Sequence, residues 1–339
     1  MRKGFNPNKD KKIEQSDYFH QVIVPVYLPK LEGYFKDGLT ILKYCLESLL
    51  STSHSQTYFT IVNNGSCDEV VDYLVDLKCK EQIHELIHTS SIGKLNSVLK
   101  GIVGHSFPLI TITDSDVLFL ADWQKGTYDV FNNFPKTGAV CPTPSSRSYK
   151  TYTSNIYWDN FFSKKMYFTA VKNPAALESF ALSVGDKMFY NKYHIRKYLT
   201  VTKNKFRAVV GAGHFVTTYR GSVFELGISR YSKFKMGGLS ESYLLDIPVV
   251  KKDFWRLSTE DNYTYHMGNV AEKWMKTEFN NLKKLKNEII PCPEFTFYGS
   301  SKFVYWMKTK LFSKIIFKKN ILKSFFKTRG LISEEAENY

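Results

Sequence analysis

Two carboxylates, Asp114 and Asp116, stand two positions apart directly after the apolar run at 109–113. Side chains alternate along an extended segment, so both carboxylates can point to the same side. Mg²⁺ and Mn²⁺ prefer such oxygen ligands and usually take one or two carboxylates together with substrate phosphates. A second apolar run follows at 117–120, and an ionised pair between two buried segments needs a partner. The pattern indicates a divalent-cation site, with a capped turn and a solvated Asp116 as the simpler alternative.

These carboxylates need a scaffold, and strand and helix signals alternate through the first 145 residues. Apolar, β-branched runs predict buried strands at 21–28, 58–64, 85–88 and 108–113. Leucines at helical spacing predict a helix over 39–50, and another is expected from about 93 to 101. A third is expected after Ser66, which forms a capping-box pattern with Glu69.

Strands separated by helices of this length are typical of βαβ units and a mostly parallel sheet. Ligands of such sheets bind outside the carboxyl ends of the strands. We therefore expect three polar strand ends, at 25–27, 63–65 and 114–116, to meet in one crevice. The second half is less regular, with strand-like stretches at 137–144 and 206–220, and an aromatic, Asn- and Lys-rich segment at 145–205.

Length and composition indicate a globular chain with a strong positive charge. The 339 residues suffice for one large α/β domain, 43% are hydrophobic, and the net charge is +15, which suggests an anionic partner. Five scattered cysteines without CxxC spacing predict a reducing compartment. No secretory signal and no run of about 18 apolar residues is visible, so we expect a soluble or surface-bound protein facing the cytoplasm.

The basic residues concentrate near the C-terminus. Residues 302–329 contain nine Lys or Arg and no Asp or Glu, and apolar residues at 303, 307, 311, 315, 322 and 326 follow one helical face. A cationic amphipathic helix with aromatics suits an anionic membrane surface, here the inner face of the cytoplasmic membrane. The alternative is a helix that packs on the rest of the protein. Nucleic acid is the least favoured partner, because no zinc spacing or RNA-binding motif is present.

Four segments in order carry a resemblance to a known family: "VIVPVYLP", "IVNNGSCDEVVDYL", "IGKLNSVLKG" and "LITITDSD". This order resembles the nucleotide-sugar-binding half of family 2 glycosyltransferases with the GT-A fold, a Rossmann-like sheet flanked by helices. The resemblance covers residues 20 to about 145 well and 206–270 more loosely. It implies a polar N-terminal segment at 1–18, a nucleotide-sugar-binding half at 19–145 and an acceptor-binding half at 146–290. The basic aromatic tail at 291–339 lies outside it.

The resemblance also assigns roles to individual residues. It implies that the nucleotide sugar, of UDP or GDP type, contacts a set of residues at the strand ends and the helix start: Pro25, Val26, Tyr27, Asn63, Asn64, Lys94, Asp114 and Ser115. Asn63 stands where the family usually has an Asp that reads uracil, which leaves the base open because an amide both donates and accepts. Asp116 would bind Mn²⁺ or Mg²⁺ with His266, and His214 is the weaker alternative ligand.

An inverting enzyme of this family needs a carboxylate base, which "GGLSESYLLD" offers as Glu241 or, in reserve, Asp246. Either could instead be a carboxylate that the helix dipole favours. The acceptor would be a saccharide or a lipid-linked saccharide, with Tyr152, Tyr157 and Trp158 as candidate stacking residues. The expected product is a cell-surface polysaccharide or lipopolysaccharide.

Two other functions remain open. A nucleotidyltransferase uses a similar sheet and metal, but it usually has a Gly-rich basic loop after the first strand, which "PVYLPKLEGYF" lacks. A non-catalytic basic protein that binds membrane or nucleic acid would show no metal-dependent nucleotide binding.

Overall fold

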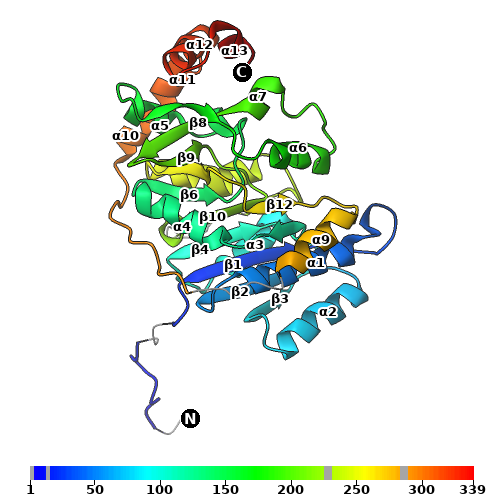
Figure 1. The fold of residues 1–339 in the computed structure, drawn as a ribbon. Coiled ribbons are helices and arrows are strands. Elements are labelled where there is room, and N and C mark those ends of the chain that lie inside the picture. Colours follow the sequence, from blue (N-terminus) through cyan, green and yellow to red (C-terminus); the bar gives the residue numbers. More distant parts are fainter. Residues whose placement is uncertain (1–3, 13–15, 225–230, 283–288) are drawn as a thin grey trace.

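A ten-stranded sheet organises the chain in a computed structural model that describes residues 4–12, 16–224, 231–282 and 289–339 (Figure 1). The strand order is β3-β2-β1-β4-β10-β6-β11-β9-β8-β7, and β10, β9 and β7 run against the other strands. The strands are β1 (His20–Val26), β2 (Thr57–Asn63), β3 (Glu85–His88), β4 (Leu109–Thr113), β6 (Thr137–Cys141), β7 (Met166–Ala170), β8 (Lys197–Lys203), β9 (Phe206–Val210), β10 (Val216–Arg220) and β11 (Trp255–Thr259).

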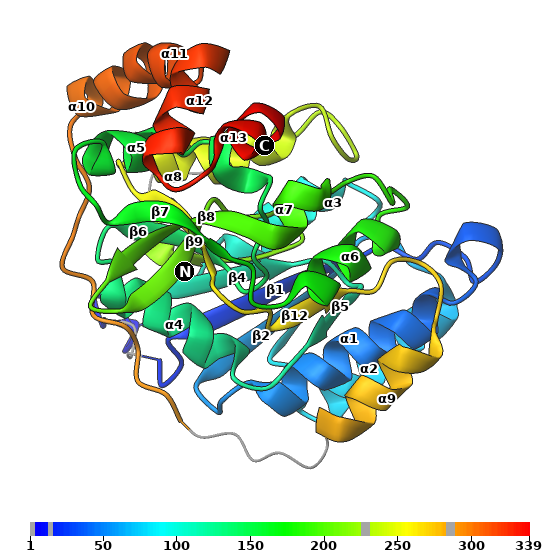
Figure 2. The ribbon, with the colours of Figure 1, turned by 45° about the horizontal axis from the view of Figure 1, so that its top comes forward.

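Helices cover both faces of the parallel part of the sheet (Figure 2). One face packs against α1 (Gly38–Thr52), α2 (Asp68–Cys79) and α9 (Lys273–Leu282), and the other against α3 (Lys94–Ile102) and α8 (Ile247–Lys251). In β1, Val22, Val24 and Val26 pack under α1, α2 and α9, and Ile23 packs on the opposite face under α3 and α8. This two-sided burial explains the uninterrupted apolar run, because a strand covered on both faces cannot alternate with polar residues.

The remaining helices lie around the second half of the sheet and at the C-terminus. They are α4 (Trp123–Asn133), α5 (Ser154–Asn160), α6 (Pro174–Ser183), α7 (Lys192–Arg196), α10 (Lys302–Trp306), α11 (Ser313–Ile316), α12 (Lys319–Thr328) and α13 (Ser333–Asn338). A separate two-stranded sheet joins β5 (Val117–Phe119) to β12 (Thr264–His266) in antiparallel register.

The predicted α/β architecture is confirmed, and the predicted strands and helices of the first half occur within a few residues of their expected bounds. The capping box at Ser66 is wrong. Helix α2 begins at Asp68 after Cys67, and the Ser66 hydroxyl instead accepts from the Leu28 amide at 3.1 Å. The hydroxyl is therefore used to fasten the end of β1 to the turn after β2.

Two expectations for the second half are corrected. The strand-like stretch at 206–220 forms two strands, β9 and β10, separated by a loop that carries His214. Tyr157 is fully buried against Phe317 and Phe325, so its ring cannot stack on an acceptor sugar.

The C-terminal tail is helical but does not form one continuous amphipathic helix. Lys318 has extended backbone angles, and α12 starts a new direction after it. Leu322 and Phe326, with Phe325 between them, pack into the second-half core, whereas Phe303 remains 67% exposed. The apolar stripe predicted from the sequence is thus divided: its end packs on the protein, and its beginning faces outward. No helix among the described residues is long and apolar enough to span a bilayer.

Candidate functional site

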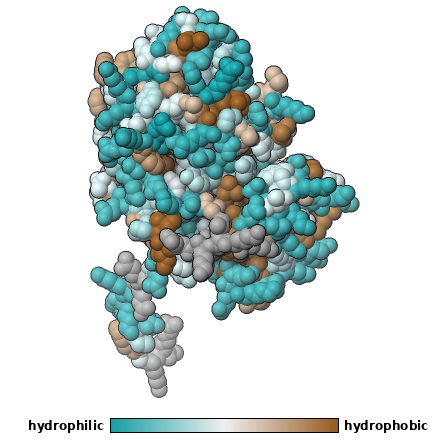
Figure 3. Space-filling view, viewed as in Figure 1, coloured by the Kyte–Doolittle hydropathy of each residue, from teal (hydrophilic) through white to brown (hydrophobic). Residues whose placement is uncertain are grey.

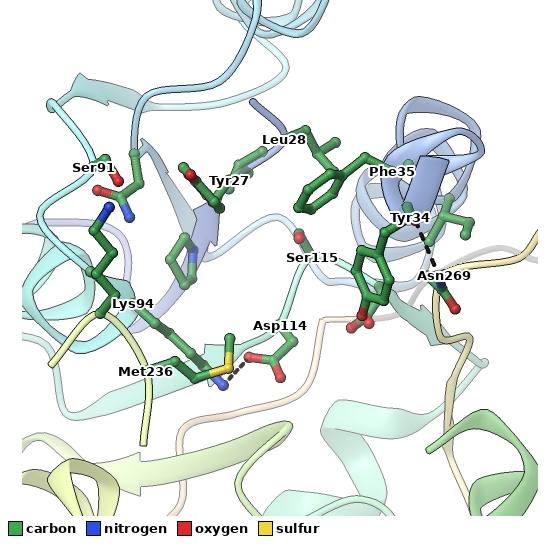
Figure 4. A pocket seen from close by; sticks show the side chains of 18 of the residues that line it. Tyr27, Leu28, Tyr34, Phe35, Ser91, Lys94, Asp114, Ser115, Met236 and Asn269 are labelled. Atoms are coloured by element: carbon green, nitrogen blue, oxygen red, sulfur yellow. Dashed lines mark hydrogen bonds and ion pairs between the residues drawn. The ribbon is translucent and has the colours of Figure 1, made fainter. Parts of the chain in front are cut away.

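A cavity of about 410 Å³ opens at the carboxyl ends of β1, β2 and β4 (Figure 4). Its walls include most of the residues that the resemblance assigned to the nucleotide sugar: Pro25, Val26, Tyr27, Asn64, Lys94, Asp114 and Ser115. Asp116, assigned to the metal, also lines it. The strand ends meet because parallel strands place their carboxyl ends at one edge of the sheet.

Asn63 is the exception, since it lies behind the cavity wall. Its side chain is 4% exposed, pairs with His88 at 3.0 Å and accepts from the Ser66 amide at 3.0 Å. The neighbouring Asn64 lines the cavity, and its side-chain oxygen Oδ1 accepts from the Ile92 amide at 2.8 Å. The side chains of Asn63 and Asn64 thus both bond to the 88–92 segment, which leads into α3.

The cavity also contains residues that the sequence reasoning missed. Tyr34 and Phe35 extend the aromatic wall begun by Tyr27, and Lys235 and Met236 close the opposite side. Figure 4 shows Tyr27, Tyr34 and Phe35 around the same opening, with Met236 near Lys94. Tyr34 and Phe35 lie in a 3-10 helix at 33–35, between β1 and α1, and Lys235 and Met236 lie in an irregular segment, so none of them follows a sequence period. The position of Tyr34 and Phe35 just before a predicted helix was the only available signal.

The start of α3 explains how the 231–236 segment reaches the cavity. Asn96 donates to the Ser232 carbonyl at 2.9 Å and accepts from the Ser232 amide at 2.7 Å. Gly93 has φ +92, and a Cβ there would lie 2.9 Å from Cα of Lys235. Glycine is required here because the backbone conformation and the close approach both exclude a side chain.

Lys94 contributes an ammonium to the cavity wall, as Lys235 also does. Its Nζ lies 2.5 Å from Oδ1 of Asp114 and 3.3 Å from Oε1 of Glu241. Burial lowers the pKa of Lys94, but the two carboxylates outweigh it and raise the pKa above the usual value. Lys94 therefore stays charged and holds Asp114 at the cavity.

Asp116 and His266 are brought together by the small β5–β12 sheet. His266 pairs with Val117 in the strand register, and its Nε2 lies 3.4 Å from Oδ2 of Asp116. The other ring nitrogen lies 2.9 Å from the Ser183 hydroxyl, which fixes the orientation of the ring. Metal-binding histidines are commonly oriented in this way by a second hydrogen bond.

The environment of Asp116 fits a cation. Burial raises the pKa of its carboxyl to about 6, with His266 opposing the shift. Oδ1 of Asp116 is buried and has no hydrogen-bond partner in the described part of the chain. That part contains no group of three His, Cys, Asp or Glu side chains able to hold a metal. Two protein ligands nevertheless match Mg²⁺ or Mn²⁺ sites, which take further oxygens from phosphates and water.

A second polar cluster, made of Glu241, His214, Asp246 and Arg256, lies beside the Lys94–Asp114 pair. Asp246 is fully buried, and its Oδ1 is 2.7 Å from the Arg256 guanidinium and 2.8 Å from Nε2 of His214. Nδ1 of His214 faces Oε2 of Glu241 at 3.6 Å. The Asp246 carboxylate has no exposed surface, which argues against it as the base, whereas the Glu241 side chain is 31% exposed. His214 belongs to this cluster, whereas His266 is the histidine that contacts Asp116.

Comparison with known proteins gives a partial sequence match. No family model matches the sequence. The chain is 25% identical over 139 residues to a poly-β-1,6-N-acetyl-D-glucosamine synthase of Staphylococcus epidermidis, an alignment that covers 38% of this chain and 34% of that protein. A second synthase of that name and species is 24% identical over the same length. The match therefore spans about a third of these relatives.

Solved structures with a similar arrangement share little sequence with this chain. The mannosyltransferase PcManGT from Pyrobaculum calidifontis, in complex with GDP-Man and Mn²⁺, has a TM-score of 0.46 and 11% identity, over 95% of this chain and 76% of that one. Residues 1–349 of S. aureus TarS give a TM-score of 0.42 and 12% identity, over 91% of this chain and 80% of that one.

Proposed function

We propose that the protein is a metal-dependent inverting glycosyltransferase that moves a sugar from a nucleoside-diphosphate sugar to a saccharide or lipid-linked acceptor. The observation that carries the proposal is the cavity at the carboxyl ends of β1, β2 and β4, which gathers Tyr27, Lys94, Asp114 and Asp116. The partial sequence match to polysaccharide synthases supports the same reaction class and suggests a role in cell-surface polysaccharide or lipopolysaccharide synthesis.

The cavity residues suit the parts of such a donor. Tyr27, Tyr34 and Phe35 offer aromatic surface to a nucleoside base, and Asp114 can accept from a ribose hydroxyl. A divalent cation held by Asp116 and His266, Mn²⁺ or Mg²⁺, would supply positive charge that neutralises the departing diphosphate. Lys94 holds Asp114 in place and adds a second positive charge to the wall.

We also propose that the tail binds an anionic membrane surface, which would place the enzyme at the inner face of the cytoplasmic membrane near a lipid-linked acceptor. The tail face consists of Phe303, Trp306, Leu311 and Ile315, which are 43–67% exposed. Figure 3 shows apolar side chains among hydrophilic ones over the C-terminal helices at the top of the view. Exposed apolar residues surrounded by lysines match the chemistry of an anionic bilayer.

Calorimetric titration with UDP and with GDP, each with and without Mn²⁺, tests the proposed donor site. We expect one nucleotide to bind at least tenfold more tightly with Mn²⁺, and Asp116→Asn to abolish that gain because it removes the negative charge that holds the cation. Asp129→Asn, which alters an exposed carboxylate on α4, is the matched control. Metal-independent binding, or an Asp116→Asn variant equal to wild type, would contradict the metal assignment. Binding of neither nucleotide would favour the non-catalytic alternative.

A further inference from the structure

A second cavity, of about 260 Å³, adjoins the proposed donor site and has no role in donor binding as described above. Its walls are largely aromatic, with Phe180 on α6, Phe189 and Tyr190 after α6, and Phe215 before β10. His266, which contacts Asp116 in the first cavity, also lines the second. The Asp116–His266 pair therefore has one member in the wall of each cavity, which places the two cavities next to each other.

Among the side chains that line the second cavity, His214 has the contacts expected of a catalytic base. Its Nε2 lies 2.8 and 2.9 Å from the two oxygens of Asp246. Arg256, itself fully buried, holds Oδ1 of Asp246 at 2.7 Å and so fixes the carboxylate in place. A neutral imidazole that donates from Nε2 to this carboxylate leaves its lone pair on Nδ1, as in a hydrolytic triad with the two ring nitrogens exchanged.

Glu241 is less suited to accept a proton. Lys94 lies 3.3 Å from one of its oxygens, so that oxygen is already engaged in an ion pair. Glu241 is not part of the wall of either cavity, whereas His214 lines the second. The charged groups that face His214 are Asp246, Arg256 and Glu241. Of these groups and His214 itself, only the imidazole lines the second cavity, and histidine is the side chain that most often serves as a general base.

We infer that the second cavity binds the acceptor saccharide and that Nδ1 of His214 accepts the proton of its attacking hydroxyl. The inference rests on the proposed function. The acceptor oxygen forms a bond to the anomeric carbon while the bond from that carbon to the diphosphate oxygen breaks, and the electron pair leaves with the diphosphate. The proton moves to Nδ1, where Glu241 stabilises the imidazolium. The aromatic walls offer flat apolar surface to the acceptor ring.

The substitution His214→Gln tests the role of the imidazole, because a Gln amide nitrogen can replace Nε2 as donor to Asp246 but provides no base. We expect kcat to fall 10²–10⁴-fold, the range for loss of a general base, with nucleotide affinity unchanged. The rate is measured as UDP or GDP released from UDP-GlcNAc and GDP-mannose, with a panel of p-nitrophenyl glycosides as acceptors. His105→Gln, which alters a histidine paired with Glu85 away from both cavities, is the matched control.

Two further measurements separate a base from a structural histidine. The acid-side fall in kcat should disappear in His214→Gln and persist in Glu241→Gln, and added imidazole should restore part of the activity of His214→Ala. Phe189→Ala should raise the acceptor KM and leave nucleotide binding unchanged. A His214→Gln enzyme with wild-type kcat and pH profile would overturn the inference while the proposed function stands. A wild-type protein that binds neither nucleotide would overturn both.

Discussion

At the scale of single residues, Lys94 links the two polar clusters. One carboxylate that it contacts, Asp114, lines the donor cavity, and the other, Glu241, faces His214. Its side chain is 17% exposed, so water compensates little for a missing partner. The separation of Asp114 from Glu241 therefore depends on the Lys94 ammonium between them.

Replacing Lys94 by Met should weaken both folding and donor binding. Asp114 and Glu241 would then face each other without a cation, so we expect the free energy of unfolding to fall by about 2 kcal/mol and nucleotide affinity to fall at least tenfold. Urea denaturation and calorimetry with UDP and GDP measure the two effects. Lys80→Met removes the lysine of an exposed pair with Asp76 and is the control. Adding Glu241→Gln to Lys94→Met should recover part of the stability, and no recovery would contradict the ionic explanation.

The sequence could predict those site residues that stand at strand ends. Asp114, Asn64 and Tyr27 lie where buried apolar runs stop, and a parallel sheet gathers such positions at one edge. Arg256 could not be found in this way, since it lies within a strand and pairs with Asp246 only through tertiary packing. Lys235 reaches the cavity because the nearby Ser232 backbone bonds to Asn96. No spacing in the sequence indicates this contact.

At the scale of elements, the prediction was accurate where burial on both faces produced continuous apolar runs and inaccurate where strands lie in sequence of mixed composition. Strands β1, β2 and β4 are covered on both faces, so their composition alone identifies them. Strands β7 and β8 pair antiparallel within the aromatic and polar segment at 145–205, and their sequences carry no clean alternation. The direction change at Lys318 likewise depends on packing against the second-half core rather than on a helix-breaking residue.

A buried polar network joins β1, β4 and α4 at the end of the sheet away from the cavity. His20 lies 2.6 Å from the Tyr128 hydroxyl and 2.6 Å from the Thr111 hydroxyl, and His54 lies 2.9 Å from the same Tyr128 hydroxyl. Burial lowers the pKa of His20 well below its usual value and that of His54 to about 4. Both imidazoles are therefore neutral in the folded protein near neutral pH.

This network should make the fold acid-sensitive. Because the folded pKa of His54 is lower than the unfolded value of about 6.5, the unfolded state binds more protons between these values, and stability falls as the pH is lowered. We expect His54 alone to cost about 2 kcal/mol between pH 7 and pH 5, measured by urea denaturation at both values. His54→Gln should reduce the loss by that amount, with His105→Gln as control. An identical pH dependence in His54→Gln and wild type would contradict this origin.

At the scale of the whole molecule, the C-terminal segment both completes the fold and leaves a charged apolar face. Phe325 and Phe326 fill the core beside Phe168, and Lys308 bonds to Asp159 and Asp253. These contacts confirm the alternative that part of the tail packs on the protein. Several other lysines, among them Lys302, Lys310, Lys314 and Lys318, remain exposed beside the tail face.

Vesicle binding tests the membrane proposal. The protein should cosediment with phosphatidylcholine vesicles that contain 30% phosphatidylglycerol and not with pure phosphatidylcholine, and the binding should weaken as salt is raised, because part of it is electrostatic. Changing Lys302, Lys310 and Lys314 to Glu should weaken it by more than 3 kcal/mol, at about 1 kcal/mol for each lysine lost. Phe303→Ser with Trp306→Ser should weaken it further by removing apolar burial.

The controls for this experiment must keep the protein folded and remove exposed apolar side chains elsewhere on its surface. Val75→Ser with Val103→Ser alters side chains that are 40% and 65% exposed on α2 and after α3, and it should bind vesicles like wild type. Because the Phe303 and Trp306 rings are at least half exposed, their replacement should leave the melting temperature nearly unchanged. If the Phe303 and Trp306 variant bound as tightly as wild type, the apolar residues would serve another contact, and the membrane proposal would retain only its electrostatic part. If wild type ignored anionic vesicles altogether, the proposal would be wrong, and the excess lysines would be a solvated surface of the tail.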